Sequence, residues 1–147
     1  MMEIRAKARR LHQKADLRLI AVDYLQLMTS GKKVESRQVE VSEFSRQLKL
    51  LGKELQVPVV ALSQLNRGPE QRTDKKPMLA DLRESGSLEQ DADMVILLHR
   101  PDAFERDDPR GGETDLIVAK HRNGPTKTVT VAHQLHLCRH TNMAPPL

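Results

Sequence analysis

The 147-residue chain has very few aromatic side chains: two Phe, one Tyr and no Trp. Proteins that hold single-stranded nucleic acid by base stacking need aromatic platforms, so this composition argues against that mode of binding. The chain also has one cysteine, Cys138, which excludes an internal disulfide framework and a cysteine-cluster metal site. The core is therefore expected to consist almost entirely of aliphatic side chains.

Long apolar runs are also missing from the sequence. No stretch approaches the roughly 18 apolar residues that a transmembrane helix needs. Residues 1–16 lack the apolar segment of a signal peptide and instead predict a helix that starts at once. This abrupt start predicts a fragment of a larger protein. A chain of this length fits one domain that can bury about 69% of its unfolded surface.

The hydrophobic pattern predicts an α/β fold. Apolar residues at helical spacing predict helices at residues 3–15, 38–55 and 79–91, the last interrupted at Gly86. Short apolar runs predict strands at residues 17–22, 58–62, 94–98 and 114–119, followed by an alternating, antiparallel strand at residues 128–137. Loops are expected at residues 29–37, 66–77 and 100–113. The order of strands and helices favours a mainly parallel sheet with antiparallel edge strands.

Four polar residues close successive apolar runs: Asp23, Gln64, His99 and Lys120. Ligands of open α/β sheets bind beyond the carboxyl ends of the strands. Asp23 could hold Mg²⁺ with its waters, and Gln64 could contact a γ-phosphate. Either residue alone also fits an ordinary strand end, and His99 is interpreted as structural.

The charge pattern points toward an anionic partner. The net charge is +4, and residues 116–147 contain four basic residues and no acidic one. Such a segment favours contact with phosphates. Solvated strand ends explain the charge pattern equally well.

Four segments together identify a family. They are LRLIAVDYLQLM, PVVALSQLNRGPEQR, LADLRESGSLEQDADMVILLHR and DLIVAKHRNGPTKTV, in that order. With them the chain closely resembles the C-terminal RecA-like motor of bacterial replicative DNA helicases, the DnaB family. The resemblance runs from about residue 3 to residue 131. It implies a RecA-like (P-loop NTPase) α/β domain truncated on its N-terminal side, with residues 1–140 in the motor and 141–147 as a tail.

The resemblance also implies roles at the ATP site. Asp23 matches the Walker B aspartate that binds Mg²⁺ through water, and Gln64 matches the glutamine that couples the γ-phosphate to a DNA loop. Lys120 and Arg122 match the pair that reaches into the neighbouring subunit's ATP site. In that pair Arg122 is the arginine finger and Lys120 its cationic companion.

Four further residues match DNA-binding positions. Arg67 lies in the segment that resembles the first DNA-binding loop. Arg83, Glu84 and Gly86 match the second loop, where side chains and backbone amides follow the phosphates of single-stranded DNA. A surface ion pair with Glu84 or Asp81 is the structural alternative for Arg83.

For the whole protein, the resemblance implies ATP and Mg²⁺ as cofactors and a homo-hexamer that moves on single-stranded DNA. It also implies primase and a helicase loader as partners, and a cytoplasmic, nucleoid-associated location.

The sequence departs from the family in two places. None of its seven glycines belongs to a G-x-x-x-x-G-K-[ST] loop. In the family that loop and the water-activating glutamate lie upstream, so the chain alone is expected to be inactive. The family's Ser-Arg-Phe ending is replaced by Cys138, Arg139 and His140.

Two other interpretations remain open. The first is a non-catalytic RecA-like module that binds DNA or a partner. The second is a RecA-like recombination or repair ATPase, which RESGSLEQDAD and KHRNGP fit less well.

Overall fold

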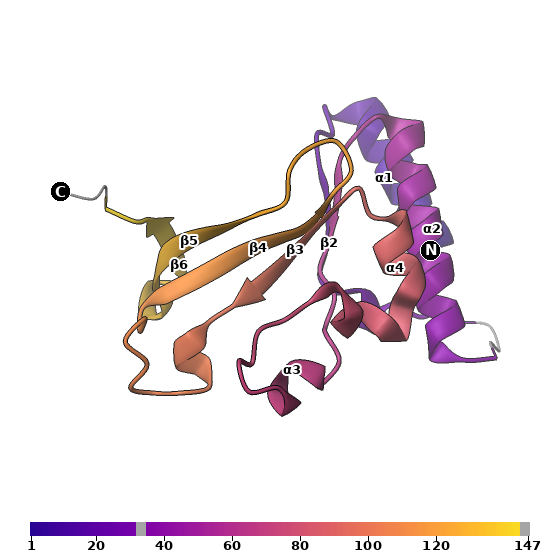
Figure 1. The fold of residues 1–147 in the computed structure, drawn as a ribbon. Helices are drawn as coiled ribbons and strands as arrows, with labels where there is room; N and C mark the ends of the chain where they lie inside the picture. Colours follow the sequence, from indigo (N-terminus) through magenta and orange to yellow (C-terminus); the bar gives the residue numbers. More distant parts are fainter. Residues whose placement is uncertain (32–34, 145–147) are drawn as a thin grey trace. The chain divides into compact units, whose positions relative to one another are not determined.

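The computed structural model describes residues 1–31 and 35–144, without the side chains of residues 83–85. The chain forms two compact units (Figure 1). The first contains residues 1–65 and 82–92. The second contains residues 66–81 and the chain from residue 93 onward.

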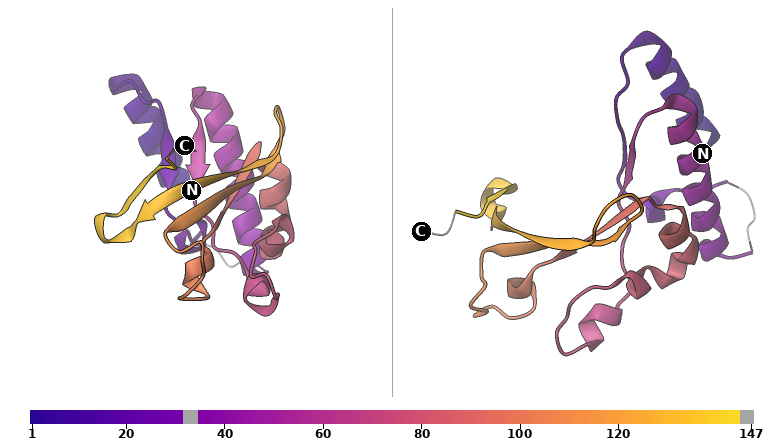
Figure 2. Two further views of the ribbon diagram at one scale, coloured as in Figure 1. Left: turned by 60° about the vertical axis from the view of Figure 1, so that its left-hand side comes forward. Right: turned by 45° about the horizontal axis from the view of Figure 1, so that its top comes forward.

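The first unit is built on a parallel pair of strands. Its elements are α1 (Met2–Lys14), β1 (Ile20–Val22), the 3-10 turn η1 (Leu25–Leu27), α2 (Arg37–Leu55), β2 (Val59–Ala61) and α4 (Gly86–Asp91). Ile20 lies opposite Val59 and Val22 opposite Ala61. The indigo α1 and purple α2 lie side by side in the views of Figure 2. The predicted strand–helix–strand order of this unit is confirmed.

Helix α2 follows directly from its sequence. Ser36 caps the amino end, where its hydroxyl accepts a hydrogen bond from the Val39 amide at 3.3 Å. Gln56 ends the helix in the left-handed region, with φ at 54°. The residues spaced three and four apart form the buried face: Val41, Phe44, Leu48, Leu51 and Leu55.

The core of the first unit lies between α1, α2 and the strands. Ala8, Leu51, Leu55 and Val57 are buried together, with partly buried apolar residues packed against them. A Cβ on Gly52 would lie 3.0 Å from Val59, so α2 approaches β2 closely at this point. Aliphatic packing thus forms this core, as the composition predicts.

The second unit is an antiparallel sheet with strand order β3-β4-β5-β6. Its strands are β3 (Met94–His99), β4 (Glu113–His121), β5 (Lys127–Gln134) and β6 (Arg139–Asn142). The short helix α3 (Gly68–Gln71) and the 3-10 turns η3 (Pro101–Ala103) and η4 (Leu135–Leu137) complete the unit, while η2 (Leu79–Ser85) crosses from one unit to the other.

The α/β class is confirmed, but the balance of strand directions differs from the prediction. Among the described strands, only β1 and β2 pair in parallel. In β3 buried residues alternate with exposed ones, although MVILLH reads as a continuously buried strand. An antiparallel sheet commonly packs one face against the core and exposes the other face to solvent, and the alternating burial of β3 follows this rule.

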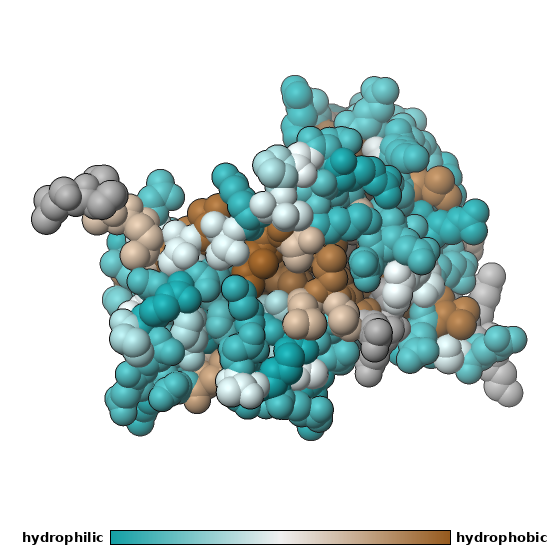
Figure 3. Space-filling model, in the orientation of Figure 1, coloured by the Kyte–Doolittle hydropathy of each residue, from teal (hydrophilic) through white to brown (hydrophobic). Residues whose placement is uncertain are grey.

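The exposed face of this sheet is unusually apolar. Ile96 and Leu98 are 50% and 65% exposed, and Val129 on β5 is also exposed. Figure 3 shows hydrophobic side chains gathered over this sheet. Apolar patches of this kind are typical of surfaces that other protein segments cover.

Three boundaries differ from the sequence prediction. The expected loop at residues 66–77 contains α3, and the predicted strand at 128–137 gives way to η4 after Gln134. Strand β6 includes Thr141 and Asn142, which pair with Ala132 and Val131. The break at Gly86 is confirmed, because η2 ends at Ser85 and α4 begins at Gly86. Within residues 1–31 and 35–144, no helix is long and apolar enough to cross a bilayer.

Adjacent leucines on α2 provide a test of the core. Leu51 is 1% exposed and Leu50 is 53% exposed. We expect Leu51→Ala to lower the free energy of unfolding by about 2–5 kcal/mol, because it removes buried methyl groups and leaves a cavity. Leu50→Ala should change it by about 0.5 kcal/mol or less. Urea unfolding of both variants measures the difference, and equal losses would contradict this account of the core.

Candidate nucleotide and DNA site

The carboxyl ends of β1 and β2 bring two predicted site residues to one edge. Asp23 follows β1 directly and is exposed, and Gln64 lies three residues after β2. Beside them is a shallow, open depression lined by Tyr24, Leu62, Ser63 and Gln64. Because the two strands run in parallel, both polar residues leave the sheet at the same end.

Gln26 joins these two strand ends. Its Nε2 donates to the Ser63 hydroxyl at 3.0 Å and to the Gln64 carbonyl at 3.3 Å. Its Oε1 accepts from the Gln64 amide at 3.2 Å. Sequence reasoning missed this residue. The sequence does contain one signal for Gln26, because it is the single amide residue in the otherwise apolar run YLQLM.

A buried carboxylate supports Gln26 from α2. Glu40 accepts a hydrogen bond from the Ser30 amide at 2.5 Å and pairs with Arg37. Arg37 in turn donates to the Gln26 carbonyl at 2.7 Å. The hydrogen bond from Ser30, with the nearby Arg37 guanidinium, lowers the pKa of Glu40. These contacts attach the segment after β1 to the first turn of α2.

Lys120 and Arg122 lie at the end of β4 in the second unit. Lys120 pairs with Val95, next to an irregularity in the β3–β4 ladder. Arg122 is the first residue after the strand, and its guanidinium lies 3.1 Å from Asp93. Both side chains of this ion pair are at least half exposed, and such pairs contribute little to stability.

A glycine turn fixes the place where β4 ends. A Cβ on Gly124 would overlap the His121 ring, so a glycine fits here without moving that ring. The His121 Nδ1 lies 3.3 Å from the Pro125 carbonyl oxygen. The predicted Asn-Gly-Pro turn is confirmed, and it leads directly from Arg122.

The predicted DNA-binding residues belong to different units. Arg67 is exposed at the amino end of α3 in the second unit. Gly86 is exposed at the start of α4 in the first unit, with open space where a Cβ would lie. Arg83 and Glu84 lie in η2, and their side chains are outside the described part of the structure.

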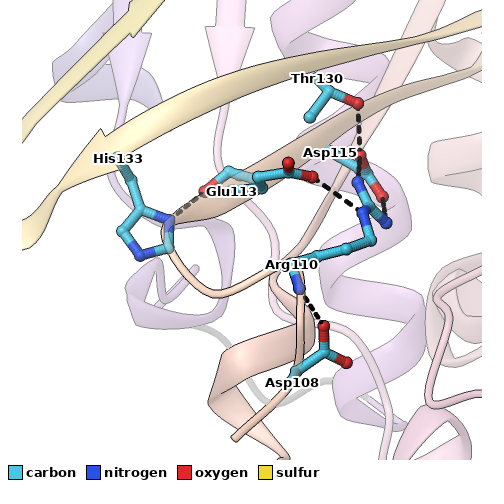
Figure 4. A network of polar contacts seen from close by, with 7 residues as sticks. Asp108, Arg110, Glu113, Asp115, Thr130 and His133 are labelled. Atoms are coloured by element: carbon cyan, nitrogen blue, oxygen red, sulfur yellow. Dashed lines mark hydrogen bonds and ion pairs between the residues drawn. The ribbon is translucent and has the colours of Figure 1, made fainter. Parts of the chain in front are cut away.

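A polar network around the buried Asp115 organises the second unit (Figure 4). Arg110 donates to Asp115 at 2.6 and 3.0 Å and to Glu113 at 2.8 Å. The Thr130 hydroxyl donates to Asp115 at 2.7 Å. The Arg110 guanidinium lowers the pKa of Asp115, which is 4% exposed. These contacts attach the loop before β4 to β4 and β5 and leave Asp115 no access to a ligand.

Two further contacts of a histidine ring join η3 to β4 and β5. The His133 ring lies 3.0 Å from the Thr114 hydroxyl and 3.1 Å from Asp102. The His133 side chain is only 5% exposed. The order of hydroxyl, imidazole and carboxylate resembles a hydrolase triad, but burial makes it a structural element of the sheet.

The described residues contain no cluster of three or more His, Cys, Asp or Glu that could hold a metal ion. Magnesium often takes one or two carboxylates and completes its shell with water and phosphate oxygens. A single carboxylate at Asp23 therefore fits a Mg²⁺ ion that arrives with a nucleotide, and does not fit a metal held by protein alone.

Comparison with known families agrees with this geometry. Residues 1–142 match the DnaB-like helicase C-terminal domain family. The chain belongs to this family. It is 89% identical to the replicative DNA helicase DnaB of Mycobacterium intracellulare over 144 residues. The matched region covers 98% of this chain and 25% of that protein. It is 56% identical to the replicative DNA helicase DnaC of Bacillus subtilis (strain 168), over 88% of this chain and 29% of that protein. The chain thus spans about a quarter to a third of the length of these relatives.

Two solved structures have the same fold. One is an ATPase domain that matches with a TM-score of 0.91 and 43% identity, over 96% of this chain and 50% of that chain. The other is a DnaB-like replicative helicase, described with its interactions with primase. It matches with a TM-score of 0.90 and 43% identity, over 96% of this chain and 35% of that chain. The fold predicted from the DnaB resemblance is confirmed.

The Arg110–Asp115 contact generates a pH-dependent prediction. We expect Asp115→Asn to lower the free energy of unfolding at pH 7 by about 1–3 kcal/mol, the range for hydrogen bonds to charged groups. The pKa of Asp115 is lowered in the folded state, so its contribution is present above the unfolded value of about 3.9. That contribution is lost as pH falls through the folded pKa, where the parent carboxylate also becomes neutral.

Urea unfolding at pH 7, 4 and 2.5 measures this dependence. The difference between parent and Asp115→Asn should shrink at the lowest pH. Asp107→Asn, at an exposed position in the same loop, is the matched control. A difference that stays constant with pH would show that packing, and not charge, explains the loss.

Proposed function

We propose that this chain is part of the motor of a ring-shaped replicative DNA helicase. In the whole protein, ATP hydrolysis drives movement along single-stranded DNA and separation of the duplex at the replication fork. One observation carries this proposal: Asp23 and Gln64 lie at neighbouring parallel strand ends in a chain of the DnaB-like family. That placement suits groups that act on a bound nucleoside triphosphate.

In this proposal Asp23 would hold Mg²⁺ through water, and the side-chain amide of Gln64 would contact the γ-phosphate. When bound, Mg²⁺–ATP supplies the transferable phosphoryl group and a cation that neutralises its charge. Gln26 positions the backbone of Gln64 through two hydrogen bonds at the end of β2, and a third joins it to the Ser63 hydroxyl. Residues outside this sequence hold the other phosphates, because no G-x-x-x-x-G-K-[ST] loop occurs in it.

Lys120 and Arg122 act on the ATP site of the neighbouring subunit of a homo-hexamer. Positive groups supplied there stabilise the charge that develops on the phosphoryl oxygens. The half-exposed Arg122 side chain lies at the surface of the second unit, where a phosphate of a neighbouring subunit could reach it.

Arg67, Arg83, Glu84 and Gly86 contact single-stranded DNA in the pore of the ring. The shortage of aromatic residues favours contacts to phosphates over base stacking. Primase and a helicase loader are the proposed partners, and the protein works at the nucleoid in the cytoplasm. The solved DnaB-like helicase described with primase supports the first of these partners.

The second candidate function is a non-catalytic module that binds DNA or a partner. The absence of the phosphate-binding loop from the 147 residues favours it. Activity of a longer protein that contains this chain separates the two candidates. A suitable protein is a chimera of the M. intracellulare relative in which this chain replaces the matching segment.

The isolated chain should show no ATP turnover, because it lacks the loop and lysine that hold the β- and γ-phosphates. The chimera should hydrolyse ATP, and Asp23→Ala should abolish that activity. A phosphate-release assay on both proteins, with and without Asp23→Ala, measures this. Turnover by the isolated chain that depends on Asp23 would refute the prediction, and an inactive but assembled chimera would favour the second candidate.

Arg122→Ala in the chimera should reduce kcat by about 10³-fold or more while nucleotide still binds, because a finger stabilises the transition state. Its action in trans is tested by mixing two chimeras. One carries a disabled phosphate-binding loop and the other carries Arg122→Ala. Partial recovery of hydrolysis is expected at interfaces that combine an intact loop with an intact arginine.

Single-turnover measurements complete this test. They detect hydrolysis at individual interfaces even when steady turnover requires the whole ring. No recovery in rings shown to be mixed, under single-turnover conditions, would contradict action in trans.

A further inference from the structure

Helix α4 directly follows the 3-10 turn η2, which carries Arg83 and Glu84, and it begins with a third proposed DNA-binding residue, Gly86. It has only six residues and none of its side chains is buried. A helix of this length is not stable by itself in water, and its one large apolar side chain, Leu88, is only partly buried. Contacts to a neighbouring element therefore hold it, and two hydrogen bonds are among them.

Two hydrogen bonds join α4 to α2 within the first unit. The Ser45 hydroxyl donates to the Asp91 carboxylate at 2.7 Å. The Ser87 hydroxyl donates to the Ser42 hydroxyl at 2.7 Å. Ser42 and Ser45 are three apart on α2, while Ser87 and Asp91 are four apart on α4, so each pair lies along one helix face. The two bonds therefore attach α4 at both of its ends.

The bond from Ser45 is the stronger of the two. Ser45 is only 8% exposed and Asp91 is half-buried, so water competes weakly for this contact. Hydrogen bonds to a carboxylate exceed those between neutral groups. Asp91 is also the last residue of α4, where the helix dipole disfavours an acidic side chain. The donor hydroxyl of Ser45 offsets that disadvantage.

We propose that Ser42 and Ser45 are positioning residues for DNA binding. They hold α4 against α2, and thereby hold the adjoining Arg83–Gly86 turn in the conformation that engages DNA phosphates. The inference rests on the proposed function for the identity of the ligand. The attachment of α4 to α2 stands on the hydrogen bonds alone. On the other side of the turn, the buried Asp81 is fixed by Arg72 and by the Met78 amide.

The first experiment measures hydrogen exchange of backbone amides in the 147-residue chain. Ser45→Ala should increase exchange across α4 and the preceding turn by about tenfold or more, because it removes a charge-assisted hydrogen bond. Exchange in α1 and β1 should be unchanged. Gln47→Ala on the same helix is the matched control, since its side chain bonds to Glu43 within α2. Unchanged exchange in α4 would overturn the proposal.

A double variant shows whether the two side chains act as a pair. Asp91→Ala should accelerate exchange about as much as Ser45→Ala does. Ser45→Ala with Asp91→Ala should add little to either change, because each single change already removes the shared bond. Fully additive effects would mean that the two residues act separately, which would overturn the pairing.

The second experiment measures single-stranded DNA binding by the chimera across a series of salt concentrations. Ser45→Ala should raise Kd by about threefold to tenfold, the effect of about one lost hydrogen bond. The slope of log K against log salt should stay unchanged, because no phosphate contact is lost. Arg83→Ala should instead lower that slope by about one unit or less. ATP hydrolysis without DNA should be the same in Ser45→Ala and the parent.

The two experiments separate the possible failures. If Ser45→Ala exchanges faster in α4 but its Kd for single-stranded DNA is unchanged, Ser45 only stabilises α4, and its positioning role is overturned. A lower salt slope in Ser45→Ala would mean direct phosphate contact, which also overturns that role. If Arg83→Ala leaves affinity and slope unchanged, the proposed DNA-binding turn is wrong, while the exchange result still decides the attachment of α4.

Discussion

The parallel pairing of β1 with β2 is the constraint on which the proposed nucleotide site depends. Each strand has only three residues, so the ladder alone cannot define the site. Helix α2 packs against the pair through the close approach at Gly52, and Gln26 connects the segments beyond both strands. The positions of Asp23 and Gln64 thus follow from backbone pairing and one bridging amide.

The sequence predicted those parts of the molecule that local patterns determine. Helix α2 follows from its apolar spacing, and the break at Gly86 follows from one residue. The direction of β3 could not be predicted, because a run such as MVILLH suits either kind of sheet. The roles of Gln26 and Arg110 were also beyond reach. Gln26 bonds to a strand end 38 residues away, and only the folded chain brings the two together. The partners of Arg110 are three and five residues away, but their pairing depends on the conformation of the loop before β4.

The resemblance to DnaB helicases supplied what local patterns could not. Asp23 or Gln64 alone fits an ordinary strand end, and the resemblance implies one site for both. The proposed groups divide between the units in an ordered way. Asp23 and Gln64 belong to the first unit and Lys120 and Arg122 to the second. A subunit's own ATP site and its action on a neighbour are thus assigned to separately packed parts of the chain.

The turn after β4 has a consequence for sequence variation. The ring of His121 occupies the space that a side chain at Gly124 would need, and it also lies against the Pro125 carbonyl oxygen. The two positions are therefore sterically linked. A relative with a larger residue at position 124 is expected to carry a smaller one at position 121, and both changes would alter how the chain leaves Arg122.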